Sequence, residues 1–266
     1  MNEIIRIENL THTYGEGTPF RRSAVENLSL DIYRGEFLGL IGHTGSGKST
    51  LVNLISRAYD ASDGAVYVDG IDVRSYSRAD LCQKVGTVAQ RSQLFKGSIR
   101  ENLLWGNENA ADDALWSALT IAQAKDVVEA KPGKLDFKLE QNGGNLSGGQ
   151  KQRLSIARTL VKKPEILILD DSSSALDFAT DAALRKAIAS LSGVTTFLVS
   201  QRIAGIREAD RILVLDNGHL VGSGTHDALM RECDAYREIY FSQFPEERAA
   251  FEGSDKNGKE RVGHEE

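Results

Sequence analysis

The sequence is poor in cysteine and proline and has no long apolar run: it contains two cysteines and four prolines in 266 residues. Cys82 and Cys233 lie far apart and form no Cys-x-x-Cys pair, so the sequence suggests neither a disulfide framework nor a zinc site. We expect two buried thiols in a reducing compartment. No stretch approaches the roughly 20 apolar residues that a transmembrane helix needs, and the N-terminus lacks a signal-peptide pattern. Work at a membrane would therefore require a partner or a further segment.

The sequence also lacks an excess of positive charge. It has 32 Lys and Arg residues against 38 Asp and Glu, a formal net charge of -6, which argues against a nucleic-acid partner held through its phosphates. Hydrophobic residues make up 41% of the chain, enough for a large core. We expect one compact domain over residues 1–245 and a polar, disordered tail over residues 246–266.

The hydrophobic pattern predicts an α/β fold. Residues 4–41 are expected to form short strands, and residues 91–163 have apolar positions at helical spacing, which predicts a helical subdomain. The wholly apolar runs 166–169 and 196–199 are typical of parallel strands covered on both faces. Residues 212–221 are expected to form a hairpin, because the Asn-Gly pair in this segment tolerates the positive φ of a tight turn.

A glycine-rich loop follows the buried strand that ends at Ile41. Residues 42–49 read Gly-His-Thr-Gly-Ser-Gly-Lys-Ser and match G-x-x-x-x-G-K-[ST], with a helical pattern after them. Glycines let backbone N–H groups approach phosphate oxygens, Lys48 is placed to reach the β and γ phosphates, and Ser49 to ligate Mg²⁺. A chance glycine-rich turn is the alternative, which the flanking strand and helix disfavour. We assign nucleotide binding to Gly42, His43, Thr44, Gly45, Ser46, Gly47, Lys48, Ser49 and Thr50.

Two further features accompany the loop. The buried strand 166–169 is followed by Asp170, a natural Mg²⁺ partner; the feature is weak alone but indicates a nucleoside triphosphatase when paired with the loop. Residues 146–150 read Leu-Ser-Gly-Gly-Gln and precede a helical run. Ser147 and Gln150 form a capping box, which can be a plain helix cap. Gly148 and Gly149, however, remove the side chains that would keep a phosphate from the helix N-terminus.

The order of these three motifs resembles that of an ABC-transporter nucleotide-binding domain, from Ile4 to about Tyr240. The resemblance implies a P-loop NTPase fold of the ABC ATPase type, with a mixed sheet core, an antiparallel β subdomain and a helical subdomain. It implies ATP and Mg²⁺ as ligands and a second ABC ATPase domain as partner, each ATP lying between one domain's P-loop and the other's Leu-Ser-Gly-Gly-Gln segment. It also implies a transmembrane partner, which would hold the chain at the cytoplasmic face of the membrane.

The same resemblance implies roles for single residues. Tyr14 would stack on adenine, Gln90 would sense Mg²⁺ and the transmembrane partner, and residues 174–177 would form the D-loop. The metal ligands would be Ser49, Gln90 and Asp170. Each has a structural alternative: a surface aromatic, a polar strand end, a helix cap.

Two residues depart from the family pattern. Asp171 stands where the family has the Glu that polarises the attacking water, and Gln201 stands where it has a His that contacts the γ-phosphate. A base one methylene short can lose much of the roughly 10²–10⁴-fold that general-base catalysis supplies, and Gln cannot carry the charge of a protonated His. The predicted catalytic set is therefore Asp171, Gln201 and Gln90, with slow or absent hydrolysis.

These departures together resemble the degenerate subunit of a heterodimeric ABC exporter. Residues 95–106 and 169–172 also resemble exporters, whereas residues 13–48, with Thr-Pro-Phe before the second strand, resemble the ATPases of energy-coupling-factor importers. The chain is thus an excised domain, a hybrid or a natural subunit. The alternatives are an importer ATPase and, from another class, a non-hydrolysing ATP-dependent dimerisation module. A soluble ABC protein of translation or DNA repair would show two cassettes or a coiled-coil insertion, and neither is present.

Overall fold

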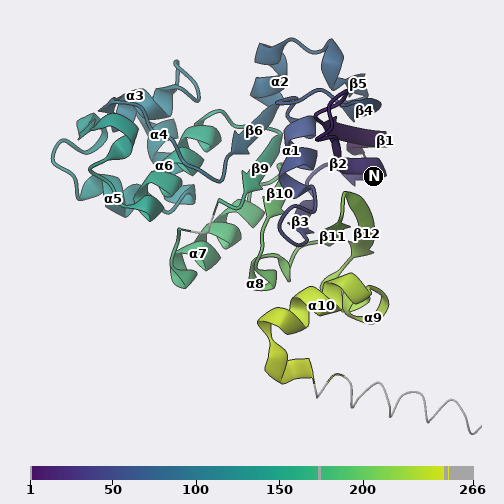
Figure 1. Cartoon of the computed structure of the whole chain (residues 1–266). Helices are drawn as coiled ribbons and strands as arrows, with labels where there is room; N and C mark the ends of the chain where they lie inside the picture. The colour runs from purple at the N-terminus through teal and green to yellow at the C-terminus, as the bar shows by residue number, and fades with distance from the viewer. Residues whose placement is uncertain (1, 173–174, 249–250, 252–266) are drawn as a thin grey trace, which may run out of the picture.

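The computed structural model describes residues 2–172, 175–248 and 251, and its centre is a six-stranded sheet (Figure 1). The strand order is β12-β11-β3-β10-β9-β6, with all neighbouring pairs parallel except the β11–β12 hairpin. The strands are β3 (Phe37–Ile41), β6 (Val85–Val88), β9 (Ile166–Asp170), β10 (Thr195–Val199), β11 (Arg211–Asp216) and β12 (His219–Gly224). The predicted hairpin is confirmed.

The central sheet is buried on both faces. Along β9, Ile166 and Ile168 belong to one apolar cluster, and Leu167 and Leu169 belong to another on the opposite face. Successive side chains of a strand point to opposite faces, so an unbroken apolar run is what such a strand requires. The predicted doubly covered parallel strands are confirmed. Because parallel strands end on the same edge, the residues after β3, β9 and β10 come together there.

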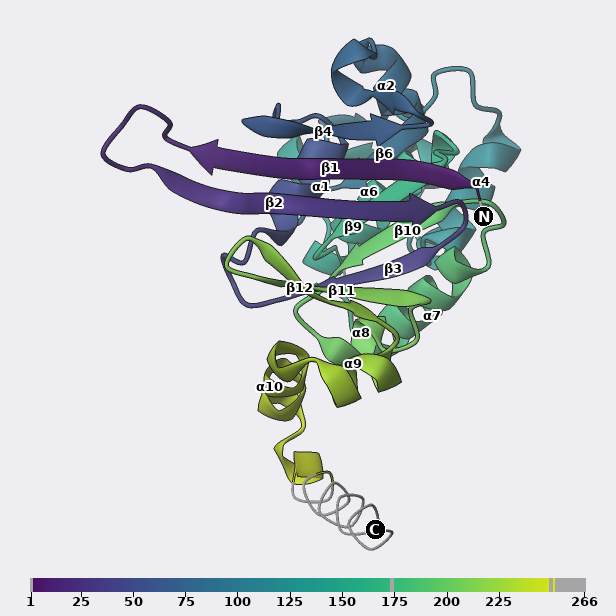
Figure 2. The same cartoon turned by 90° about the vertical axis from the view of Figure 1, so that its right-hand side faces the viewer.

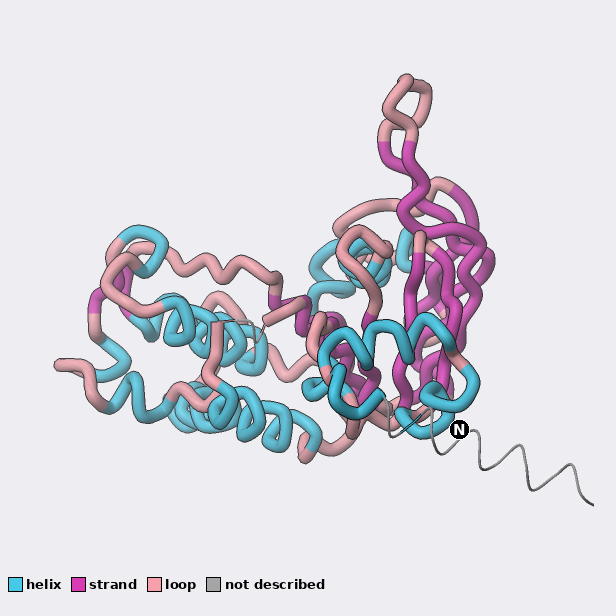
Figure 3. The backbone as a smooth tube through the Cα atoms, turned by 60° about the horizontal axis from the view of Figure 1, so that its bottom comes forward, coloured by secondary structure: helices cyan, strands magenta, loops and turns pink. Residues whose placement is uncertain are grey.

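A four-stranded antiparallel sheet, in the order β2-β1-β4-β5, covers one face together with α1. Its strands are β1 (Glu3–Tyr14), β2 (Arg22–Tyr33), β4 (Asp63–Val68) and β5 (Ile71–Asp72); helices η1 (Val73–Ser75) and α2 (Arg78–Lys84) follow. The expectation of short strands is wrong here, since β1 and β2 have 12 residues each. Register shifts let this long pair twist, and its end projects from the body (Figures 2 and 3).

The predicted helical segment 91–163 forms a lobe beside the central sheet (Figure 1), and its buried residues join the apolar cluster on one face of that sheet. Apolar positions of this lobe, including Leu115, Leu119 and Ala122, are buried, whereas Trp105 ends a helix and is exposed. Its elements are β7 (Gly97–Ser98), α3 (Ile99–Leu104), α4 (Asp112–Ile121), α5 (Lys125–Glu129), η2 (Lys134–Asp136), β8 (Lys138–Leu139), η3 (Gln141–Gly143) and α6 (Gly148–Val161).

The remaining helices are α1 (Lys48–Ile55), α7 (Phe178–Ala189), α8 (Ile203–Ile206), α9 (His226–Glu232), α10 (Asp234–Gln243) and η4 (Pro245–Glu247). The predicted tail 246–266 lies outside the described residues except for 246–248 and Phe251, whose ring lies 5.5 Å from that of Phe241. Within the described part of the chain, no helix has the length and apolarity to cross a bilayer.

The two cysteines differ in exposure. Cys233 is buried, but Cys82 is exposed, because Leu81 is the buried residue of α2 and Cys82 faces away from the core. The expectation of two buried thiols is therefore wrong for Cys82.

Candidate functional site

The glycine-rich loop joins the end of β3 to the start of α1. Gly47 caps α1 with φ 101° and no side-chain cap, so N–H groups of the first helical turn face outward. A Cβ at Gly47 would lie 2.2 Å from the carbonyl oxygen of Ala24, so only glycine fits. The loop therefore offers backbone donors and the positive end of a helix to an anion.

Lys48 lies beneath this loop. Its ammonium group donates to the carbonyl oxygens of Gly42 and His43 at 2.7 and 2.8 Å and to Ser46 Oγ at 3.2 Å. Burial lowers the pKa of Lys48, and the charges of Asp170 and Asp171 oppose that shift. A cation held at this point is positioned to meet a phosphate group above the loop.

Ser49 and Asp170 face one another across the site. Ser49 Oγ donates to Asp170 Oδ1 at 3.2 Å. Burial raises the pKa of Asp170, the Ser49 hydrogen bond lowers it, and the charge of Asp171 raises it. One hydroxyl and one carboxylate are a partial set of the oxygen ligands that Mg²⁺ takes together with substrate phosphates. The described residues contain no cluster of three or more His, Cys, Asp or Glu that could hold a metal ion.

Asp171 and Gln90 form the next pair. Gln90 Nε2 donates to Asp171 Oδ2 at 3.0 Å, and the Asp171 backbone N–H donates to the Val199 carbonyl at 3.0 Å. Asp171 has φ 45°, in the left-handed region, which favours glycine and is uncommon for other residues. Gln90 lies just after β6, where the chain leaves the sheet for the helical lobe. Two of the three predicted catalytic residues are thus in direct contact.

The third predicted catalytic residue, Gln201, follows β10 and lines the same pocket. Its carbonyl oxygen accepts a hydrogen bond from Gln243 Nε2 at 2.8 Å, and the N–H of Ile203 donates to Gln243 Oε1 at 3.0 Å. A side chain of α10 therefore fixes the backbone of this loop. The sequence reasoning missed Gln243, because one polar residue near a helix end carries no recognisable pattern.

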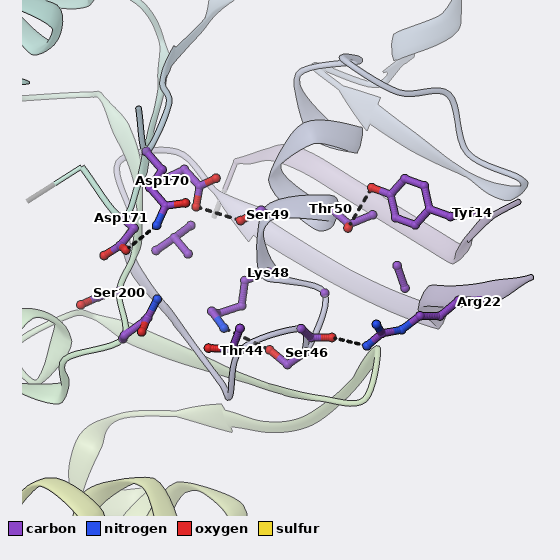
Figure 4. Close-up of a pocket in the computed structure, with 16 residues that line it drawn as sticks. Tyr14, Arg22, Thr44, Ser46, Lys48, Ser49, Thr50, Asp170, Asp171 and Ser200 are labelled. Carbon is purple, nitrogen blue, oxygen red and sulfur yellow. Dashed lines mark hydrogen bonds between the residues drawn. The ribbon is translucent and has the colours of Figure 1, made fainter. Parts of the chain in front are cut away.

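These groups line a pocket of about 320 Å³ (Figure 4). Tyr14 is 40% exposed at its edge, and its hydroxyl lies 3.2 Å from Thr50 Oγ1. The loop residues from Thr44 to Thr50 line the pocket, whereas Gly42 and His43 supply carbonyl oxygens to Lys48. Lining residues that the sequence reasoning did not assign are Arg22, Ala24, Val199 and Ser200.

The Leu-Ser-Gly-Gly-Gln segment does not line this pocket. The Ser147 N–H donates to Gln150 Oε1 at 3.1 Å and the Gln150 N–H to Ser147 Oγ at 3.3 Å, so the predicted capping box begins α6. Ser174, the first residue of the predicted D-loop, lies outside the described residues; Asp177 caps α7 by accepting from the Thr180 N–H.

Comparison with known proteins places these motifs in context. A sequence model described as ABC transporter matches residues 25–174. The uncharacterised ABC transporter ATP-binding protein YfiB of Bacillus subtilis is 42% identical over 91% of this chain and 42% of that protein. The β-(1→2)glucan export ATP-binding/permease protein NdvA of Rhodopseudomonas palustris is 40% identical over 94% of this chain and 41% of that protein.

A solved structure is also similar. The chain superposes on a bacterial Atm1-family ABC exporter with ATP bound, with a TM-score of 0.85 and 32% identity over 91% of this chain and 42% of that one. The chain thus spans less than half the length of these relatives.

Proposed function

The chain belongs to the ABC transporter family of ATP-binding proteins, and from this premise we propose that it binds Mg-ATP in an exporter-type transporter whose own hydrolytic site is impaired. This proposal is supported by the composition of the pocket. A complete phosphate loop with Lys48 and Ser49 lines the same pocket as Asp171 and Gln201. The first pair can hold nucleotide. The second pair is weaker at activating water than the Glu and His of the family pattern.

The structure gives a reason why Asp171 would act slowly. Its backbone is fixed through the Val199 carbonyl and its carboxylate accepts from Gln90. A base must come within about 2.6–3.2 Å of the proton it removes, directly or through one water. A shorter side chain on a fixed backbone leaves the attacking water to be oriented at longer range.

We further propose a dimer with a second ABC ATPase domain. Ser147, Gly148 and Gly149 form a capped helix start with no large side chain, and they do not line this chain's pocket. An anion-binding helix N-terminus away from the chain's own loop is suited to a partner's nucleotide. In this arrangement Asp171 and Gln201 affect one site, whereas Ser147 completes the other.

A membrane partner would dock on the helical lobe. Phe95 and Trp105 are 44% and 69% exposed and stack with ring centroids 4.4 Å apart. Phe95 lies in the segment that leads from Gln90 into the lobe, so a partner seated here would be linked to Asp171 through one short segment. Exposed aromatic pairs are typical of interfaces. The chain would then lie at the cytoplasmic face of the membrane.

The test compares ATP hydrolysis by the purified chain with that of Asp171→Glu plus Gln201→His, each alone and mixed with a candidate partner ATPase chain. Gln243 donates to the backbone carbonyl of Gln201, so this contact does not depend on the Gln201 side chain. We therefore expect the double variant to keep its fold. We expect little hydrolysis by the wild type alone and a gain from the double variant. Hydrolysis at a normal rate by the wild-type chain alone would refute the impaired site.

An importer ATPase is the second candidate, favoured by the Thr18-Pro19-Phe20 turn of the β1–β2 hairpin, whose sequence resembles that of importers. Co-purification separates the two functions. A membrane complex with a second ATPase chain supports the exporter, and a complex with a small substrate-binding membrane protein supports the importer. ATP-dependent dimers without hydrolysis in any complex would indicate a dimerisation module.

A further inference from the structure

Arg22 enters the nucleotide pocket from the hairpin, outside residues 25–174, which the family comparison matched. It is the first residue of β2 and the Cα partner of Tyr14, the last residue of β1. Residues directly opposite in an antiparallel pair project from the same face of the sheet. Tyr14 and Arg22 therefore reach the phosphate loop side by side (Figure 4).

The guanidinium of Arg22 has N–H donors that are available to a ligand. Its Nη2 donates to the Gly45 carbonyl oxygen at 3.5 Å, at the outer limit of a hydrogen bond. Across the described ranges 2–172 and 175–248, no carboxylate oxygen lies within 4.0 Å of it. An unpaired guanidinium beside an anion site has donors in a planar fork that matches phosphate oxygens.

Gly45 of the phosphate loop has no side chain, and this leaves room for the Arg22 guanidinium. Gly45 has φ +82°, and a Cβ built there would lie 3.3 Å from Arg22 Nη2. Arg22 and Lys48 are the two cations among the pocket's lining residues, and the Lys48 ammonium is already bound to two carbonyl oxygens and Ser46 Oγ from below the loop. The alternative role for Arg22, a tether between hairpin and loop, rests on one weak contact.

We propose that Arg22 is a phosphate-binding residue that donates charge-assisted hydrogen bonds to the polyphosphate chain of the nucleotide. This inference rests on the proposed function, since it concerns the same nucleotide. Lys48 meets the phosphates from beneath the loop, and Arg22 meets them from the hairpin side. The contact favours nucleoside di- and triphosphates over the nucleoside, whose ribose and base carry no negative charge.

The experiment measures dissociation constants of Mg-ATP, Mg-ADP and adenosine by calorimetry for the wild type, Arg22→Ala, Arg22→Lys and Arg21→Ala. Arg21 is the matched control, because its side chain is exposed and does not line the pocket. We expect Arg22→Ala to weaken ATP and ADP binding by about tenfold, as for one hydrogen bond to a charged group, and to leave adenosine unchanged. Arg22→Lys should fall between, because an ammonium lacks the fork.

Ionic strength supplies a second readout. The ratio of the Arg22→Ala and wild-type dissociation constants for ATP should shrink as salt is added, because the guanidinium is exposed. A thermal melt checks that each variant is folded.

Two results would overturn the assignment of Arg22 alone: equal ATP affinity in wild type and Arg22→Ala while Lys48→Ala abolishes binding, or an equal loss for ATP and adenosine. The second result would mean that the hairpin, not the charge, was altered. Failure of the wild type to bind ATP would overturn the proposed function together with this inference.

Discussion

At the scale of single residues, the partly buried carboxylate of Asp170 destabilises the folded protein at neutral pH, a cost that its proposed role as a Mg²⁺ ligand would explain. Burial raises its pKa in the folded protein. The folded protein therefore favours the protonated form of Asp170. The resulting stabilisation is fully present below the ordinary pKa of aspartate, and it is lost as pH rises through the raised pKa. Asp170→Asn should thus raise the melting temperature of the nucleotide-free protein at pH 7, and the difference from the wild type should narrow as the pH falls toward the ordinary pKa of aspartate.

Asp72 is the matched control for this prediction. Its hydrogen bonds from Arg74 lower its pKa, so its contribution is present above the ordinary value and is lost as pH falls. Asp72→Asn should lower the melting temperature at pH 7. Melts from about pH 3 to 8 distinguish the two slopes, because the Asp72 contribution is lost only below the ordinary pKa of aspartate. A lower melting temperature for Asp170→Asn at pH 7 would contradict the burial cost assigned to Asp170. Calorimetry tests the proposed Mg²⁺ ligation separately, and we expect this variant to lose the Mg²⁺-dependent part of ATP binding.

Alanine substitutions at the two adjacent glycines that begin α6 should affect stability and ATP hydrolysis differently. A Cβ at Gly148 would lie 3.7 Å from Ala175 Cβ, an ordinary contact, whereas one at Gly149 would lie 2.9 Å from the Ala175 carbonyl oxygen. Gly148→Ala should therefore fold with an unchanged or higher melting temperature but slow ATP hydrolysis by the complex with the partner chain. Gly149→Ala should lower the melting temperature. Full activity of the folded Gly148→Ala complex would show that no phosphate approaches this helix.

At the scale of elements, the cap of α6 has a structural and a proposed functional role. Ser147→Ala removes the side-chain acceptor for the Gln150 N–H and should cost about 1 kcal/mol of unfolding free energy. Ser77→Ala at α2, where Ser77 accepts from the Asp80 N–H, should cost a similar amount. Only Ser147→Ala should slow hydrolysis in the complex with the partner. Urea unfolding and ATPase rates measure the two effects, and equal rates for both variants would leave Ser147 as a plain cap.

Elements with a strong local pattern were predictable from the sequence. The α6 run follows from the helical spacing of its apolar residues, and the β9 and β10 runs follow from unbroken apolar stretches, which are typical of strands covered on both faces. The 12-residue lengths of β1 and β2 were not predicted, because their bulges break the alternation. The pairing of Tyr14 with Arg22 depends on the register across the hairpin, and the position of Gln243 depends on tertiary packing. Neither leaves a local signal.

At the scale of the whole molecule, the surface formed by Phe95 and Trp105 should decide attachment to the membrane partner. Trp105→Ala in the assembled transporter should reduce the fraction of this chain recovered with membranes, because a 69% exposed indole would lose its contact. ATP affinity should not change, since Trp105 does not line the pocket. Ile71→Ala, at a 48% exposed apolar position on β5, is the control. Equal membrane recovery for both variants would place the docking surface elsewhere.

The separation of the Lys48 loop from the Ser147 helix start has a kinetic consequence. If each nucleotide requires donors from two chains, the rate of hydrolysis at low concentration depends on the product of the two chain concentrations. A serial dilution would then lower the specific activity, and tethering the two chains would abolish this dependence. Two inactive chains, this one damaged at Lys48 and the partner damaged at its corresponding signature serine, would place both lesions at a single nucleotide. The second nucleotide, bound by the partner's loop and this chain's intact Ser147, would keep its complete set of donors.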